Sequence, residues 1–480
     1  MNISLLPLDS RPCNTLFPLK LARIAAENLR LPDRGFMDYF TRPAWFPYID
    51  EWLLDSAASG DYFIISLDML AYGGLIASRK TGGPDALPRL DLIRRMKDLN
   101  PALRIFAFGV IMRTSITTID EKSRRYWELI NEYSRLKGLG GDFAAVEKQI
   151  PPEVLGSFLA ARERNHRLNC GAVDLLNDRV IDCLALVQED TAPGGIQVVE
   201  QEKLRERLDP AVSPEAFIHN GADEAAMVLL GRVLNSEKPP LIHSEFLNPR
   251  GEAMTAAYED RPFIQNIESQ IRCCGLALGG ADAPLQLLIL PPKGDRQWNS
   301  HAQFEGAQDY SGAELEDMAE RVERRLGAGK TVGLLDAAYA NGGHAAFMKK
   351  LWDRRLLGAA SSGIGAYAGW NTASNSLGTV LAQLSALCRA GAGPNAGENA
   401  LFTLERYLDD CLYQSAVRPR IEERLSREGI NVLNVGAAKA GVEKLIREEL
   451  EALAPEVQFR FSLPWPRTFE GRIEVQGLRP

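Results

Sequence analysis

Carboxylate side chains end most of the apolar, β-prone runs of this 480-residue chain. The residues at these run ends are Asp9, Asp68, Glu189, Asp190, Glu245 and Asp336. Short apolar runs separated by helical patterns are typical of buried parallel strands. Ligands of parallel α/β proteins bind at the carboxyl ends of the strands. Several carboxylates gathered at such an edge therefore favour an enzyme site.

The adjacent carboxylates Glu189 and Asp190 are our first candidates for general acid/base catalysis. Neighbouring residues of an extended chain point to opposite faces, so we expect one to face the ligand and the other to orient it. The pair resembles the adjacent acids of hexosaminidase-like glycosidases, a likeness at the level of the fold. Asp336 and Glu245 are reserve candidates for a nucleophile or base. The alternative interpretation of the pair is an acidic helix N-terminus.

Two N-terminal segments contain candidates for substrate binding: Asp9, Arg11, Asp68, Tyr72 and Arg79. The planar guanidinium of Arg11 is suited to carboxylates, phosphates or sugar hydroxyls. Tyr72 offers an aromatic platform, and the glycine pair at 73–74 allows backbone to approach a ligand closely. The alternative is a structural ion pair between Asp9 and Arg11.

Further binding candidates lie after residue 220: Asp223, Glu224, Asn341, Trp370 and Asn371. Aromatic rings interleaved with amides and carboxylates suit sugar recognition, because rings stack on apolar sugar faces while polar groups bind hydroxyls. For Asp223 and Glu224 the alternative role is to cap a helix. Thr372 or Ser374 is likewise a candidate cap of the helix that follows Asn371.

Composition excludes several classes of protein. The formal net charge of −8 argues against a protein that binds nucleic-acid backbones. No run of 18 apolar residues indicates a membrane span, and the N-terminus lacks a signal-peptide pattern. Seven scattered cysteines without Cys-x-x-Cys spacing predict reduced thiols in a cytoplasmic protein. The five histidines show no zinc-binding spacing, which leaves only an all-oxygen Mg²⁺ or Ca²⁺ site open.

Nine regions read as strands, beginning near Ile3, Phe36, Tyr62, Arg104, Leu184, Leu241, Leu285, Thr331 and Ile364. We predict a (β/α)8 barrel over residues 1–390, with a helical insertion at about 116–182. A Gly/Pro-rich stretch near 390 separates this domain from a mainly helical C-terminal region, 391–480, with two closing strands. The alternative is a pair of doubly wound α/β domains.

Seven segments together resemble a bacterial family of uncharacterised proteins, the domain of unknown function 4127. They are PLDSRPCN (7–14), LDMLAYGGLIASR (67–79), LVQEDTAPGG (186–195), GADE (221–224), DAAYANGG (336–343), YAGWNTASNSLGTVLA (367–382) and PWPRTFE (464–470). The resemblance covers nearly the whole chain and implies no particular activity. Two positions depart from it: Glu189 stands where an Asp is expected, and Ser10 stands where an acidic residue is usual.

The leading hypothesis is a glycoside hydrolase, or another carbohydrate-active enzyme, that binds a small-molecule or oligosaccharide ligand and needs no cofactor. Its catalytic and binding residues would line one pocket. The first alternative is a metal-assisted hydrolase or lyase with Mg²⁺ or Ca²⁺ held by Asp9, Asp68, Asp190 and Asp336. The second is a non-catalytic sugar- or metabolite-binding protein. No nucleic-acid or membrane partner is expected, and the oligomeric state stays open.

Overall fold

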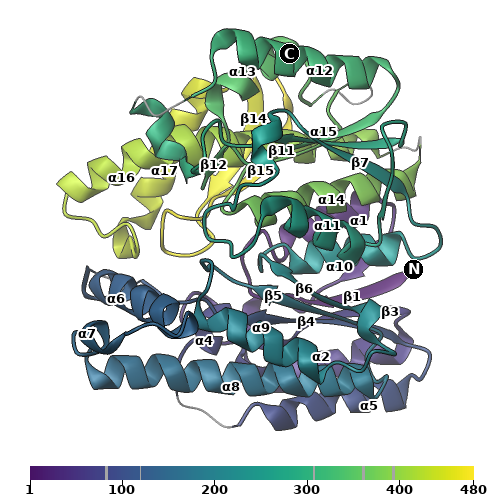
Figure 1. Ribbon diagram of the computed structural model, residues 1–480. Helices are drawn as coiled ribbons and strands as arrows, with labels where there is room; N and C mark the ends of the chain where they lie inside the picture. The colour runs from purple at the N-terminus through teal and green to yellow at the C-terminus, as the bar shows by residue number, and fades with distance from the viewer. Residues whose placement is uncertain (82–84, 119–120, 306–308, 359–362, 392–394, 480) are drawn as a thin grey trace. The chain divides into compact units, whose positions relative to one another are not determined.

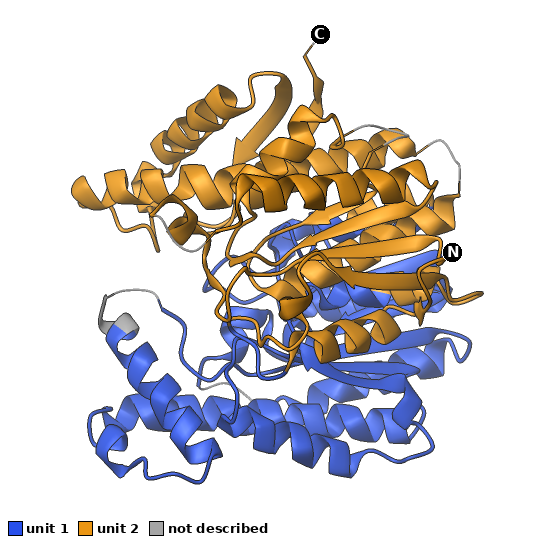
Figure 2. Cartoon of the chain, turned by 45° about the horizontal axis from the view of Figure 1, so that its top comes forward, with its two compact units in different colours: residues 1–18, 27–229, 258–261 blue, residues 19–26, 230–257, 262–480 orange. Residues whose placement is uncertain are grey.

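The computed structural model describes residues 1–479 except 82–84, 119–120, 306–308, 359–362 and 392–394 (Figure 1). The chain forms two compact units (Figure 2). Unit 1 comprises residues 1–18, 27–229 and 258–261, and unit 2 comprises residues 19–26, 230–257 and 262–480. The division that we expected near residue 390 falls inside unit 2.

Unit 1 is built on an open sheet of six parallel strands. The strands are β1 (Asn2–Leu6), β2 (Asn28–Arg30), β3 (Tyr62–Ser66), β4 (Arg104–Ile111), β5 (Cys183–Gln188) and β6 (Ala216–Asn220), in the order β2-β1-β3-β4-β5-β6. Strand order changes direction at β1, which is the pattern of a doubly wound sheet. Because the strands are parallel, their carboxyl ends meet at one edge of the sheet.

Helices cover a face of this sheet. The helices α2 (Phe46–Ser59), α5 (Asp91–Leu99) and α8 (Pro152–Asn177) are drawn in Figure 1, and their side chains share one buried cluster with Ile65 of β3 and Leu184 of β5. The other helices that begin in this unit are α1 (Leu16–Ile24), α3 (Leu67–Tyr72), α4 (Leu75–Ser78), α6 (Glu121–Gly138), α7 (Ala144–Glu147), α9 (Ile196–Arg207) and α10 (Ala225–Leu234). Between β4 and β5 the chain is therefore helical, through α6, α7 and α8.

Unit 2 contains a second open parallel sheet, in the order β13-β11-β9-β7-β8. Its strands are β7 (Leu241–Phe246), β8 (Ala277–Leu278), β9 (Leu285–Leu290), β11 (Thr331–Asp336) and β13 (Ala366–Ala368). Two short strands, β10 (Trp298–Asn299) and β12 (Tyr339–Ala340), pair beside it, and β14 (Val457–Ser462) pairs antiparallel with β15 (Arg472–Leu478). As in unit 1, the second strand lies outside the first and the later strands continue on the other side.

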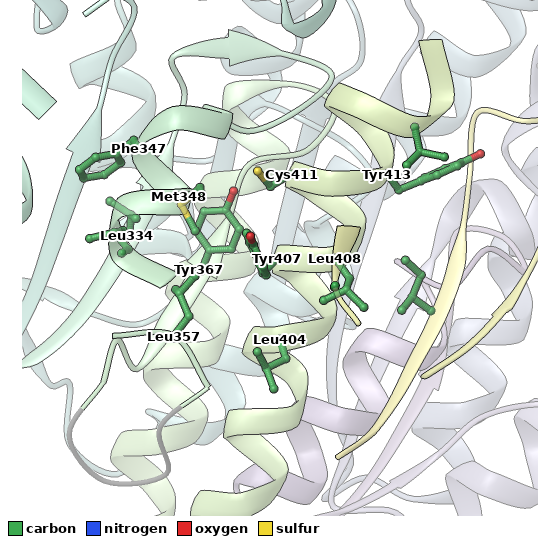
Figure 3. Close-up of a cluster of buried hydrophobic side chains, with 14 of the residues drawn as sticks. Leu334, Phe347, Met348, Leu357, Tyr367, Leu404, Tyr407, Leu408, Cys411 and Tyr413 are labelled. Atoms are coloured by element: carbon green, nitrogen blue, oxygen red, sulfur yellow. The ribbon is translucent and has the colours of Figure 1, made fainter. Parts of the chain in front are cut away.

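Helices pack on both faces of the second sheet. Val332 and Leu334 share a buried cluster with α12 (Gly312–Gly327) and α13 (Ala345–Asp353), and Figure 3 shows part of this cluster around Tyr367. The residue between them, Gly333, points to the opposite face, where an added Cβ would come within 2.7 Å of Val380 in α14 (Ala373–Ala390). The remaining helices are α11 (Phe263–Cys273), α15 (Ala396–Arg406), the π-helical segment η6 (Tyr407–Val417), α16 (Arg418–Arg427) and α17 (Lys439–Leu453).

The mixed α/β class with parallel strands is confirmed, but the described strands form two open sheets and not one closed barrel. The expected strand at Phe36 is also wrong: the strand is β2, and Arg34–Phe36 forms a 3-10 turn. Four strands of the described residues were not predicted: β6, β8 and the two-residue strands β10 and β12. Hydrogen bonding to a neighbouring strand makes these segments strands, and their short patterns do not reveal it.

No helix in the described part of the chain is both long and apolar enough to cross a bilayer. The seven cysteines all lie within the described residues and form no disulfide.

Candidate functional site

In unit 1, charged side chains gather after the carboxyl ends of the parallel strands. They are Asp9 and Arg11 after β1, Asp38 after β2, Asp68 after β3, Arg113 after β4, Glu189 and Asp190 after β5, and Asp223 after β6. Six of these eight residues were candidates from the sequence: Asp9, Arg11, Asp68, Glu189, Asp190 and Asp223. Asp38 and Arg113 were not.

Arg11 joins two buried carboxylates. Its Nε donates to Asp9 Oδ2 at 2.9 Å and its Nη2 donates to the same oxygen at 2.7 Å. On the other side, Nη1 donates to Asp223 Oδ2 at 2.9 Å and Nη2 donates to Asp223 Oδ1. Asn14 donates to Asp9 at 2.9 Å. The structural ion pair that we considered for Asp9 and Arg11 is therefore present, extended by Asp223 into a triad.

Two further carboxyls at this edge have raised pKa values. Burial raises the pKa of Asp68 to about 6, against a hydrogen bond from the backbone N–H of Val110 at 2.9 Å. Burial, and then the charge of Asp9, raise the pKa of Asp38, which accepts a hydrogen bond from the backbone of Ser10 at 2.7 Å. Asp68 thus joins α3 to β4, and Asp38 joins the chain after β2 to the chain after β1.

Glu189 and Asp190 are bound by arginines. Arg79 and Arg113 both donate to Oε1 of Glu189, Arg113 at 2.9 Å, and Arg113 also donates to Asp190. Arg79 Nη1 donates to Thr117 Oγ1 at 3.0 Å. Glu189 is buried, whereas the side chain of Asp190 is 30% exposed. One acid is thus inside the network and the other reaches its surface.

Tyr72 and the glycine pair after it belong to the core of unit 1. Tyr72 is buried, and the guanidinium carbon of Arg164 lies 4.2 Å from its ring centroid. Gly73 adopts a left-handed conformation (φ 77°) at the end of α3, where a Cβ would come within 2.7 Å of the backbone of Ala44. Local backbone packing therefore explains the glycine without a ligand.

Glu224 and its neighbours precede α10. Glu224 is fully buried, and its carboxylate lies over Gly221, leaving no room there for a Cβ. His219 of β6 is also fully buried, its Nδ1 lies 2.8 Å from the carbonyl of Asn220, and burial lowers its pKa to about 4. These side chains are part of the interior.

The later candidates belong to unit 2, and three of them shape the ends of β11 and β13. Asp336 is buried, accepts a hydrogen bond from the backbone of His344 at 2.7 Å, and has a pKa raised by burial to about 6. The backbone N–H of Asn341 donates to the carbonyl of Asn371 at 2.7 Å, and both residues have positive φ. These contacts hold two loops together.

Trp370 and Glu245 are also engaged with their neighbours. The indole N–H of Trp370 donates to Thr379 at 3.1 Å, and Thr372 forms the N-cap of α14, as one of our alternatives predicted. Glu245 of β7 accepts hydrogen bonds from Arg321 and Arg325, which outweigh its partial burial and hold its pKa below the ordinary value.

A pocket of about 460 Å³ lies at the carboxyl ends of β9 and β11, within unit 2. Its lining residues are Pro292, Lys293, Gly294, Asp295, Arg296, Trp298, Ala302, Glu305, Asp309, Tyr310, Ala338, Tyr339 and His344. The volume is that of a small-molecule site. Three aromatic rings and three carboxylates are among the lining side chains.

Asp309 and His344 form a dyad in this pocket. His344 Nε2 lies 2.6 Å from Asp309 Oδ1, and His344 Nδ1 accepts a hydrogen bond from the backbone N–H of Phe347 at 3.2 Å. Because Nδ1 is an acceptor, the ring proton is on Nε2 and points to Asp309. Partial burial acts to raise the pKa of Asp309, but the hydrogen bonds from His344 and from the backbone of Tyr310, together with nearby charges, outweigh it, so the pKa lies below its ordinary value.

Tyr339 supplies an unsatisfied hydroxyl. Its side chain is buried and lines the pocket, yet its hydroxyl has no hydrogen-bond partner in the described part of the chain. Burial, and then the charge of Asp309, raise the pKa of this hydroxyl. A ligand atom that both donates and accepts would satisfy this hydroxyl.

Sequence reasoning missed Asp309 and His344. The strand at residues 285–290 was expected, but the loop after it was read only as irregular chain, and His344 directly follows the segment DAAYANGG. A search of every strand end for polar residues would have included Lys293. The Asp309–His344 contact joins residues 35 apart and has no local pattern.

Unit 1 also contains a cavity, of about 370 Å³. It is lined by Thr114, Trp127, Glu128, Asn131, Glu132, Arg135, Ala192 and Gly195. Most of these residues are on α6, so the helical stretch after β4 forms its wall. Within the ranges that the structure describes, no group of three or more His, Cys, Asp or Glu residues is placed to hold a metal ion.

Two parallel α/β sheets with polar strand ends and a pocket beside one of them define an α/β protein with the features of a small-molecule site. The chain belongs to the family DUF4127, described as a protein of unknown function, whose model matches residues 3–474. No curated protein and no solved structure matches the chain.

Proposed function

We propose that the protein is a glycoside hydrolase whose substrate binds in the pocket of unit 2, with Asp309 as the catalytic carboxylate. The observation that carries the proposal is the environment of Asp309. Its side chain is 32% exposed while the partner His344 is buried, so one carboxylate is held ionised at the surface of a pocket. An oriented, ionised carboxylate acts as a general base or as a nucleophile.

The rest of the pocket suits a hydroxyl-rich ligand. Trp298, Tyr310 and Tyr339 supply aromatic surface for the apolar face of a sugar ring. A sugar hydroxyl both donates and accepts, so one hydroxyl would satisfy the Tyr339 hydroxyl and the Asp309 carboxylate together. This complementarity supports a polyol over a purely anionic or apolar ligand.

Glycoside hydrolysis needs a second carboxyl group to protonate the leaving oxygen. Glu305 lines the same pocket, and we assign it this role. The acids first expected from the sequence, Glu189 and Asp190, are instead hydrogen-bonded by Arg79 and Arg113. Either acid would have to leave its arginine before donating a proton, so we assign catalysis to Asp309 and Glu305.

The test is hydrolysis of a panel of aryl glycosides by the wild type, Asp309→Asn and Glu305→Gln. Loss of the catalytic base is expected to lower kcat by roughly 10²–10⁴-fold. Asp282→Asn, which changes an exposed carboxylate outside the pocket, serves as the matched control and should retain full activity. The wild type should keep its activity in EDTA.

Three outcomes would contradict the assignment. Equal rates for Asp309→Asn and wild type would move catalysis away from this pocket. Loss of activity in EDTA would favour metal-assisted hydrolysis. Saturable sugar binding without turnover would favour the non-catalytic alternative.

A further inference from the structure

Three arginines follow the strand ends of unit 1, and they differ in how fully their charges are compensated. Arg11 is bound by two carboxylates, Asp9 and Asp223. Each carboxylate accepts hydrogen bonds from two nitrogens of the Arg11 guanidinium. Arg79 and Arg113 instead share Glu189, and only Arg113 has a second carboxylate, Asp190. Among the described residues, Arg79 thus donates to one carboxylate, which it shares with Arg113.

The two arginines use the two oxygens of Glu189 unequally. Both arginines donate to the same oxygen, Glu189 Oε1, while Glu189 Oε2 is buried and has no partner among the described residues. Nε of Arg79 and Nε of Arg113 are also buried without a partner there. An arginine that binds a carboxylate with its full fork uses two nitrogens and both oxygens. Glu189 fills neither fork.

The charges around Arg79 also favour the binding of an added anion. The side chain of Arg79 is 8% exposed, and burial, followed by the charge of Arg113, lowers its pKa well below the ordinary value for arginine. Two guanidiniums held together in the interior favour an added anion. The network is open to solvent at Arg113 and Asp190, whose side chains are 18% and 30% exposed.

We propose that Arg79 and Arg113 form a binding site for an anionic group, carboxylate or phosphate, which Glu189 occupies in the ligand-free protein. The incoming anion takes Nε and Nη2 of the guanidiniums and displaces Glu189. Displacement costs few hydrogen bonds, because one oxygen of Glu189 makes none with the described residues. This site is independent of the pocket assigned to glycoside hydrolysis, since both arginines belong to unit 1.

The experiment measures binding of two probes, inorganic phosphate and acetate, by calorimetry at constant ionic strength. Glu189→Gln removes the competing charge, so it should bind at least one probe about tenfold more tightly than the wild type. The double variant Glu189→Gln/Arg113→Met should lose this gain, and Glu189→Gln/Arg113→Lys should keep part of it, because lysine retains the charge but not the fork. The preferred probe identifies the anionic group.

The matched control is Glu200→Gln. Glu200 binds Arg162 through two hydrogen bonds of 2.7 Å, so its loss also uncovers a buried arginine in unit 1. An equal gain in this control would show that any uncompensated arginine suffices, and would overturn the proposal. So would equal affinities of wild type and Glu189→Gln, or a gain that persists in Glu189→Gln/Arg113→Met. Circular dichroism verifies that each variant is folded before the titration.

Discussion

The two ring nitrogens of His344 make different contacts, and a substitution can remove one contact while keeping the other. Nδ1 accepts the hydrogen bond that caps α13, while Nε2 donates to Asp309. Asparagine is among the best N-cap residues but is shorter than histidine. His344→Asn therefore keeps the cap and removes the hydrogen bond to the carboxylate.

His344→Asn is expected to raise the pKa of Asp309 toward its ordinary value and to leave the free energy of unfolding within about 1 kcal/mol of wild type. A base with a higher pKa loses its charge at higher pH, so the acid limb of the kcat/KM profile should move to higher pH. The profile on whichever aryl glycoside is turned over provides the measurement. An unmoved acid limb with reduced kcat would make His344 a structural residue only.

A second readout needs no substrate. Because the pKa of Asp309 is depressed in the folded protein, the ionised carboxylate with its hydrogen bond from His344 adds stability above the unfolded pKa, and this stability is lost as pH falls through the folded pKa. In His344→Asn this acid-induced loss should be smaller. Urea unfolding of both proteins, at several pH values down to the lowest at which the wild type is folded, compares them directly.

Residue types alone predicted where charge would gather, but not how it would be compensated. Asp9, Asp68, Glu189 and Asp190 do follow strands in unit 1. The residues that compensate these charges can lie far away in the chain: Arg11, which binds Asp9, also binds Asp223, 212 residues further on. Pairing at that separation depends on strand order, which no local pattern contains.

Elements were predictable where an apolar run is long enough to stand out. β4 has seven buried residues in eight, whereas β2 has one in three and β8 has two residues in all. β6, AFIHN, has only two buried residues and both are polar. Such segments are strands because a neighbour pairs with them, as Leu184 of β5 pairs with Ala216. Because these strands were missed, the nine apolar runs found in the sequence suggested a (β/α)8 barrel, whereas the described strands form two open parallel sheets.

The N-terminus of α14 was predictable, because Thr372 stands before a long apolar helix and the cap is local. Its hydroxyl accepts from the backbone of Asn375 at 3.3 Å, and the Asn375 side chain accepts from the backbone of Thr372 at 3.4 Å. Thr372→Ala removes half of this reciprocal pair and should lower the free energy of unfolding by about 1 kcal/mol. Thr372→Ser keeps the oxygen and should stay near wild type. Equal urea midpoints for the two variants would show that this cap contributes nothing.

The whole chain repeats one arrangement twice without a repeat in its sequence. Both sheets place the second strand outside the first and add later strands on the other side. Such a sheet needs only buried apolar strands and connecting helices, and many sequences satisfy that requirement. The two units were accordingly an alternative from the sequence and not the first choice.

The chain also passes between the units more than once, and residues 258–261 return to unit 1 between two segments of unit 2. Arg261 in this return donates to the carbonyl of Ile218 at 3.0 Å, to Gln201 at 2.6 Å and to Asp260 at 3.0 Å. Asp260 is almost completely buried and also accepts from Gln201 at 2.7 Å. Four residues thus attach to unit 1 through one cation and one buried carboxylate.

Arg261→Ala should therefore destabilise the protein far more than a surface arginine would. It leaves the Asp260 carboxylate buried without its cation, a loss of about 3–5 kcal/mol. Adding Asp260→Asn removes the unpaired carboxylate charge, so the double variant should regain part of the lost free energy of unfolding. The control is Arg272→Ala, whose side chain is 65% exposed in an ion pair with Glu268 at 3.6 Å, and whose effect should stay within about 0.5 kcal/mol. Urea unfolding of the four proteins measures these differences. If Arg261→Ala loses no more than Arg272→Ala, the return segment is held by its backbone, and the buried pair does not fasten it to unit 1.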